Sequence, residues 1–290
     1  MEDLSKSNTW EKGLESIDEV ISFYEKWIHK NEQISQTNPL SIKEKLIFNC
    51  KKALERIKKG RSLLDKDDVQ EVFMMMNSCM LQQQKRSLSP KRFADKNKNN
   101  DIIFPKSFVE KEGRGSWRAF QICFILANLN SFIDPQEEEE RNLVDLIWFP
   151  TGGGKTEAYL GLAAFSILWR RLNNNSSEGG GTDVLMRYTL RLLTSQQFQR
   201  ASTLICALER LRKNNPQTLG EERISLGIFV GGDASPNTES GIRNAWYDLS
   251  KVYKSNKFVV TSCPWCSAEM GRTEKKENRK HISIDLGYTR

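Results

Sequence analysis

The chain has 290 residues, of which 38% are hydrophobic and 28% are charged. This balance excludes a disordered or fibrous chain, and the length suits about two folding units. The formal net charge of +7 favours a polyanionic partner such as nucleic acid, although solvated helical surfaces are also commonly basic.

The sequence offers no secretory or membrane signal. Residues 1–7 lack the apolar core of a signal peptide. The most apolar stretch, Phe120–Leu129, is interrupted by polar residues and is far shorter than the roughly 20 residues of a membrane span. The six cysteines show no regular paired spacing. We therefore expect a cytoplasmic protein with reduced thiols and no membrane partner.

Three helices are expected in residues 1–86, which we interpret as an N-terminal helical domain. Apolar residues at three- and four-residue steps predict a helix over 9–31. A second helix begins at the Ser-x-x-Glu capping box of Ser41 and is expected to end at Gly60. A third is expected over 67–84. Its methionine-rich face predicts core packing, with a flexible partner-binding face as the alternative.

Residues 87–115 are expected to be a polar, basic linker. They show no periodicity and include runs such as Pro-Lys-Arg and Asp-Lys-Asn-Lys-Asn-Asn. Two interpretations remain open, namely contact with a nucleic-acid backbone and a solvated loop.

The most informative stretch is 146–157, with the sequence LIWFPTGGGKTE. An apolar run stops at a proline, three glycines follow, and Lys-Thr opens a helical pattern, which is the order of a phosphate-binding P-loop. Glycines adopt backbone angles that turn successive N–H groups toward a polyphosphate, and the helix N-terminus adds partial positive charge. Lys155 is expected to reach the terminal phosphates of ATP, and Thr156 to hold its Mg²⁺. The alternative is a glycine-rich turn before an ordinary helix. The candidate nucleotide-binding residues are Arg118, Gln121, Pro150, Thr151, Gly152, Gly153, Gly154, Lys155, Thr156 and Glu157, and Lys155 and Thr156 are also the candidate catalytic residues.

Two neighbouring features refine the kind of loop. Phe149 stands where the general P-loop pattern has its first glycine, which disfavours a GTPase-type loop and is typical of superfamily-2 helicases, where this position varies. Arg118-x-x-Gln121, upstream of the loop, resembles the adenine-sensing motif of those helicases, because a glutamine amide both donates and accepts. The alternative is a glutamine that caps a helix without contacting a ligand.

Strands alternating with helices are expected over residues 116–290. This order predicts an α/β fold, in which a parallel sheet flanked by helices forms a first RecA-like, ATP-binding lobe. The expected strands are 143–149, 183–188, 224–230 and 257–261, and the expected helices are 116–129, 156–172, 189–212 and 237–253.

Candidate nucleic-acid contacts follow the second expected strand. Thr189, Arg191 and Thr194 offer hydroxyl and guanidinium donors beside helix N–H groups, and such groups bind phosphates without reading sequence. DNA is the expected partner. The alternative is that Arg191 forms a surface salt bridge.

Cys263-Pro-Trp-Cys266 has the two-residue gap of a zinc knuckle. A structural Zn²⁺ site takes four ligands, and only His281 lies at a plausible distance downstream. We expect residues 263–290 to begin a zinc-ribbon-like insertion whose site is incomplete in this chain. A redox Cys-x-x-Cys is disfavoured, because the following residues do not resemble the helix of a thioredoxin-like unit.

These stretches together resemble one family, the DrmA-type helicases of bacterial DISARM anti-phage systems. The resemblance implies a superfamily-2 ATPase that moves on DNA and works beside a methyltransferase and other defence proteins. The residues that carry it are 71–82 (EVFMMMNSCMLQ), 117–129, 144–165 and 184–200, together with the Cys263–Cys266 pair.

Parts of a helicase motor are missing from these 290 residues. A motor needs an acidic strand-end motif and a second lobe with an arginine finger. Neither Asp233 nor Asp285 has the expected sequence context for that motif. We therefore expect ATP–Mg²⁺ binding with little or no hydrolysis, in the N-terminal part of a longer enzyme that needs a complementary C-terminal helicase half. The alternatives are a non-enzymatic, ATP-gated DNA- or partner-binding module and a truncated remnant, and a kinase or GTPase is disfavoured.

Overall fold

The computed structural model describes two compact units that are discontinuous in sequence. Unit 1 combines residues 1–82, 115–185 and 210–223, and unit 2 combines residues 83–114, 186–209 and 224–290. The predicted division into 1–86, 87–115 and 116–290 stays a prediction. The residues that the structure describes are 1–33, 40–99, 101–134, 136, 142–150, 152–174, 180–188, 191–230, 236, 238–251 and 259–270.

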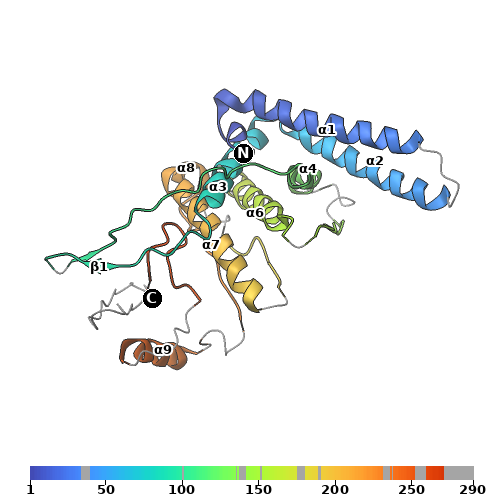
Figure 1. The fold of residues 1–290 in the computed structure, drawn as a ribbon. Coiled ribbons are helices and arrows are strands. Elements are labelled where there is room, and N and C mark those ends of the chain that lie inside the picture. Colours follow the sequence, from blue (N-terminus) through green and yellow to red (C-terminus); the bar gives the residue numbers. More distant parts are fainter. Residues whose placement is uncertain are drawn as a thin grey trace. The chain divides into compact units, whose positions relative to one another are not determined.

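The described chain is mainly helical (Figure 1). The predicted helices over 9–31, 67–84, 156–172 and 237–253 are confirmed as α1, α3, α6 and α9. In chain order the elements are η1 (Asp3–Ser5), η2 (Ser7–Thr9), α1 (Trp10–Gln33), α2 (Leu40–Leu63), α3 (Asp67–Arg86), β1 (Asp95–Lys96), β2 (Ile102–Ile103), α4 (Ala119–Ile133), α6 (Lys155–Asn173), α7 (Arg191–Asn214), α8 (Pro216–Leu219) and α9 (Glu239–Lys251).

The predicted parallel sheet of a RecA-like lobe is wrong. In the four segments expected to be strands, no described residue is part of a regular strand. Among the described residues the strands are β1 and β2, an antiparallel pair of two residues each in unit 2. A short apolar run predicts an extended chain but does not supply its hydrogen-bonding neighbour. Residues 143–149 have no regular secondary structure, and Val144, Leu146 and Trp148 are 94%, 84% and 88% exposed.

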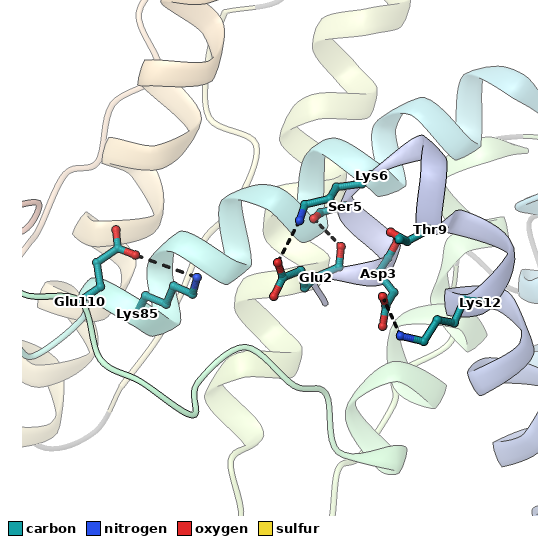
Figure 2. A network of polar contacts seen from close by, with 8 residues as sticks. All are labelled: Glu2, Asp3, Ser5, Lys6, Thr9, Lys12, Lys85 and Glu110. Atoms are coloured by element: carbon teal, nitrogen blue, oxygen red, sulfur yellow. Dashed lines mark hydrogen bonds and ion pairs between the residues drawn. The ribbon is translucent and has the colours of Figure 1, made fainter.

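Two 3-10 turns precede α1 in unit 1 (Figure 2). Lys6 Nζ lies 2.9 Å from a carboxylate oxygen of Glu2, and Lys12 Nζ lies 3.2 Å from Asp3. Exposed ion pairs of this kind contribute little to stability. The burial of the Leu4 side chain therefore contributes more than these ion pairs to holding η1 in place.

The core of unit 1 is centred on Phe165 of α6, which is fully buried. Its ring centroid lies 6.5 Å from that of Phe73 in α3, 6.3 Å from Phe132 in α4 and 6.0 Å from Trp169 one turn along. Trp10 of α1 meets the other side of Phe73 at 6.1 Å. Aromatic residues from four helices thus meet in one cluster, which fixes α6 behind the glycine-rich loop.

The methionine run of α3 belongs to this core. Met76 and Met80 are fully buried, as is Phe73 on the same helix face, and Cys79 is 3% exposed. The core-packing interpretation of the run is therefore confirmed for these residues.

Gly60 does not end α2, which continues to Leu63, so the predicted helix end is wrong. A Cβ at position 60 would lie 1.9 Å from the backbone oxygen of Leu126 in α4. The glycine therefore serves close helix packing: it lets the backbones of α2 and α4 touch.

The residues before the loop are fixed to α2 of unit 1 by an ion pair. Both carboxylate oxygens of Asp145 accept from the guanidinium of Arg56 in α2, at 2.7 and 2.8 Å. The hydrogen bond from Arg56 lowers the pKa of Asp145, burial opposes this effect, and a hydrogen bond with Asn128 adds to it.

We expect Arg56→Gln to lower the free energy of unfolding by about 1 kcal/mol at pH 7. Because the folded-state pKa of Asp145 is depressed, the pair stabilises above the unfolded pKa near 3.8, and this contribution disappears as the pH falls through the folded value. Urea unfolding of wild type and variant should therefore show a difference that shrinks in acid. If the difference in unfolding free energy were as large at the lowest pH at which both proteins fold as at pH 7, the ion pair would not be the source of that difference.

None of the described helices combines the length and the apolar character needed to span a bilayer.

Candidate phosphate-binding loop

The glycine-rich loop reaches the N-terminus of α6 through two left-handed glycines. Gly152 has φ +82° and Gly154 has φ +87°, a region that side chains rarely adopt. Gly154 is the N-cap of α6, and the N–H of Gly153 donates to the carbonyl of Pro150 at 3.0 Å. The three consecutive glycines therefore form a tight turn, and α6, a helix of 19 residues, begins directly after it.

Two side chains of the α4 N-terminus hold the carbonyl groups of this loop. Arg118 Nη1 donates to the Gly153 carbonyl at 2.6 Å, and Gln121 Nε2 donates to the Gly154 carbonyl at 2.6 Å. The other polar atom of Gln121, Oε1, accepts the N–H of Arg118 at 2.8 Å and so caps the N-terminus of α4. Both atoms of the buried Gln121 amide are thus engaged within unit 1.

These contacts fix the direction of two amide groups. In a trans peptide the C=O of one residue and the N–H of the next point in opposite directions, and the described residues contain no cis bond. Holding the carbonyls of Gly153 and Gly154 toward α4 therefore turns the N–H groups of Gly154 and Lys155 away from α4. The first N–H groups of α6 also lack partners within the helix, as at any helix N-terminus. The arrangement suits an anion.

The remaining loop residues surround this turn. Lys155 Nζ donates to the carbonyl of Phe149, so the ammonium group folds back over the loop. The ring of Phe149 stacks on Phe120 of α4, with centroids 3.9 Å apart. Thr156 is half-buried in the first turn of α6, and the neighbouring carboxylate of Glu157 is buried.

The start of α4 is positioned by α3 and α6. Trp117 Nε1 donates to Asn77 Oδ1 at 2.7 Å, and Asn77 Nδ2 donates to the carbonyl of Phe73 at 2.8 Å. A Cβ at Gly161 of α6 would lie 2.8 Å from the Trp117 ring. Arg118 therefore follows a tryptophan that is wedged between two helices, which explains how its guanidinium reaches the loop.

The structure brings most of the predicted nucleotide-binding residues together, namely Arg118, Gln121, Pro150 and the run Gly152–Glu157. Thr151 lies outside the described residues. The adenine contact of Gln121 stays a prediction, and its capping contact matches the alternative interpretation. Sequence reasoning missed the stacking of Phe120 on Phe149 and the role of Asn77, since a contact between distant residues leaves no local signal.

The predicted DNA contacts are not described in detail. Thr189 lies outside the described residues. Arg191 and Thr194 belong to the first turn of α7, but their side chains are outside the described part.

The cysteine pair forms a tight turn in unit 2. The N–H of Cys263 donates to Ala268 O at 2.7 Å, and the N–H of Ser267 donates back to Cys263 O at 2.8 Å. Burial, and then the neighbouring thiols of Cys263 and Cys266, raise the pKa of Cys206 in α7 to about 11. Within the described residues no three His, Cys, Asp or Glu side chains are grouped to hold a metal ion, and His281 lies outside them.

The fold and the loop define a helix-rich protein in which a glycine-rich backbone turn precedes a largely buried helix. No family model matches the chain. The chain is 35% identical over 268 residues to the DISARM protein DrmA of Bacillus paralicheniformis, a match that covers 88% of this chain and 23% of that relative. The chain is therefore DrmA-like over nearly its whole length, as the resemblance predicted, and it spans less than a quarter of the relative's length.

Proposed function

We propose that the chain binds ATP–Mg²⁺ at the loop 149–157 and acts in a DISARM-type anti-phage system. One observation carries this proposal: Arg118 and Gln121 hold the carbonyls of Gly153 and Gly154, which leaves backbone N–H groups for phosphate oxygens at the N-terminus of α6. Amides at a helix N-terminus bind phosphate through hydrogen bonds and through the helix dipole.

Each loop residue has a distinct expected task. Lys155 leaves the Phe149 carbonyl and binds the terminal phosphates, because a phosphate is a stronger partner for an ammonium group than a neutral carbonyl. The Thr156 hydroxyl, in the first turn of α6, is a candidate ligand of the Mg²⁺ that accompanies ATP.

The proposed biological role follows from the similarity to a DISARM protein. A DrmA-like protein would couple ATP to movement on DNA beside other defence proteins such as a methyltransferase. These 290 residues lack the acidic motif and the second lobe, so we propose nucleotide binding with turnover below about 0.1 per second. The second candidate function is a non-enzymatic module whose affinity for DNA or a partner protein changes with bound ATP.

Calorimetric titration of the purified chain with ATP in Mg²⁺ buffer tests the proposal. Lys155→Ala should weaken binding about 10- to 100-fold, the value of one or two charge-assisted hydrogen bonds. Lys30→Ala, which removes an exposed lysine from α1, is the matched control and should bind like wild type. Equal affinities of all three proteins would overturn the proposal, as would the absence of any binding by wild type.

Zinc binding at Cys263 and Cys266 stays a prediction. The described residues supply two thiols on one turn and a third thiol nearby on α7, which is short of the four ligands of a structural site. No step of the proposed function depends on zinc.

A further inference from the structure

Unit 2 contains a strongly basic segment, residues 83–114, which we call the basic arm. It holds nine lysines and arginines against four acidic residues, a net charge of +5 within a chain of net charge +7. Most of the excess positive charge of the protein is therefore concentrated in about a tenth of its length.

The basic arm is a folded element of unit 2. Arg92 donates its N–H to Ser267 O and accepts the N–H of Glu269, both at 2.8 Å, and its Nη1 donates to Cys266 O at 3.2 Å. Its Nε donates to Lys106 O at 2.7 Å, which ties the two sides of the arm together. β1 and β2 pair within the arm. These contacts fix Arg92 against the cysteine turn and pair the two short strands, so the arm is part of the fold of unit 2.

The cations near the start of the basic arm stabilise the fold of unit 2. The Arg86 guanidinium lies 4.2 Å from the centroid of the Trp265 ring and pairs with Glu110, and Lys85 lies 4.0 Å from the same carboxylate (Figure 2). Lys91 pairs with the buried Glu269 at 3.1 Å. These contacts neutralise charge near the cysteine turn.

The outer cations are different. Lys98, Lys106 and Arg114 are exposed, and within the described residues none of their side chains has an ion-pair or hydrogen-bond partner. The pKa of Lys111 is lowered by burial and then by its neighbours Arg114 and Arg200. The like charges of Lys111, Arg114 and Arg200 therefore lie close enough to repel one another, a situation that a bound polyanion relieves.

An exposed aromatic ring lies on the same arm. Phe93 is 67% exposed, next to the anchored Arg92, and Lys91 Nζ lies 5.8 Å from its ring centroid. An exposed ring beside cations is the platform on which unpaired bases stack, whereas the bases of a duplex are already stacked on one another. This observation favours single-stranded over double-stranded nucleic acid.

We propose that the basic arm binds single-stranded DNA, with Lys98, Lys106 and Arg114 on the phosphates and Phe93 stacked on a base. The choice of DNA as the ligand rests on the proposed function, while the location of the site rests on the arm itself. These residues are different from the predicted contacts Thr189, Arg191 and Thr194.

Fluorescence anisotropy of labelled dT20, titrated with the full chain at several salt concentrations and without nucleotide, tests the site. The arm variant carries Lys98→Gln, Lys106→Gln and Arg114→Gln. The control variant carries Lys26→Gln, Lys30→Gln and Lys45→Gln, which remove the same charge from exposed positions of α1 and α2.

The slope of log affinity against log salt concentration should be less steep by about 2 in the arm variant, because each of the three lost phosphate contacts contributes about 0.7 to the slope. The control variant should keep the wild-type slope. Phe93→Ala should weaken binding about 5- to 100-fold, the value of one stacked base, without changing the slope. Equal slopes for the arm and control variants would overturn this site while leaving DNA binding by the chain intact. Tighter binding of a 20-base-pair duplex than of dT20 would also overturn it, and no binding by wild type would overturn the DNA part of the proposed function as well.

Discussion

Gly154→Ala is expected to lower the free energy of unfolding by about 2–3 kcal/mol and to weaken ATP binding at the same time. At φ +87° a side chain costs about 1–2 kcal/mol of backbone strain. The new Cβ would also lie 2.8 Å from Gln121 Nε2, which would have to give up its bond to the Gly154 carbonyl, at a cost of about 1 kcal/mol.

Gly152→Ala provides the matched control for this variant. Gly152 has a similar φ of +82°, but no atom lies within 4 Å of the place that its Cβ would take. Gly152→Ala should therefore show the backbone strain alone, about 1–2 kcal/mol. Urea unfolding followed by circular dichroism, with calorimetry for ATP, measures both effects. If the free energy of unfolding fell by the same amount in both variants, the hydrogen bond from Gln121 to the Gly154 carbonyl would make no contribution to stability.

Gly60→Ala is expected to destabilise unit 1 by about 2–4 kcal/mol, although alanine is the better helix former by about 1 kcal/mol. The Cβ would lie 1.9 Å from Leu126 O and 2.6 Å from Leu126 C. These are backbone atoms of a helix, so the whole of α2 or α4 must shift. The variant should melt about 5–15 °C below wild type.

The control for Gly60 is Gly13→Ala in α1. There the Cβ would meet mainly the side chain of Leu4, at 2.6 Å, and that side chain can rotate away. We expect a change of less than about 1 kcal/mol, since relief of the glycine penalty offsets the repacking. A melting temperature of Gly60→Ala equal to that of Gly13→Ala would show that the α2–α4 contact adapts without cost.

The helices could be predicted because the information for each one is local. The apolar spacing in 9–31 predicted a helix that is confirmed, and the helix predicted over 67–84 is confirmed as well. The end of α2 was mispredicted at Gly60, because a helical glycine fits helix packing as well as helix termination, and only the position of Leu126 separates the two.

The sheet could not be predicted from extended segments alone. Residues 143–149 have the apolar character of a strand, but a strand also needs a hydrogen-bonding neighbour that no single segment specifies. In the structure Asp145 is bound by Arg56 of a helix instead. The turn before α6 could be predicted, because three glycines and a following helix are a local signal. The contacts of Arg118 and Gln121 with its carbonyls were not predicted, since the sequence suggested only an adenine contact for this pair.

The most direct test of the account is whether ATP reaches these glycines. Selective ¹⁵N labelling of glycine gives at most 18 amide signals, and alanine variants assign those of residues 152–154. Adding Mg–ATP should move these three signals and leave Gly227 of unit 2 in place, and Lys155→Ala should suppress the change at the same ATP concentration. If ATP bound while the signals of residues 152–154 stayed still, the nucleotide site would lie elsewhere and the account would be wrong.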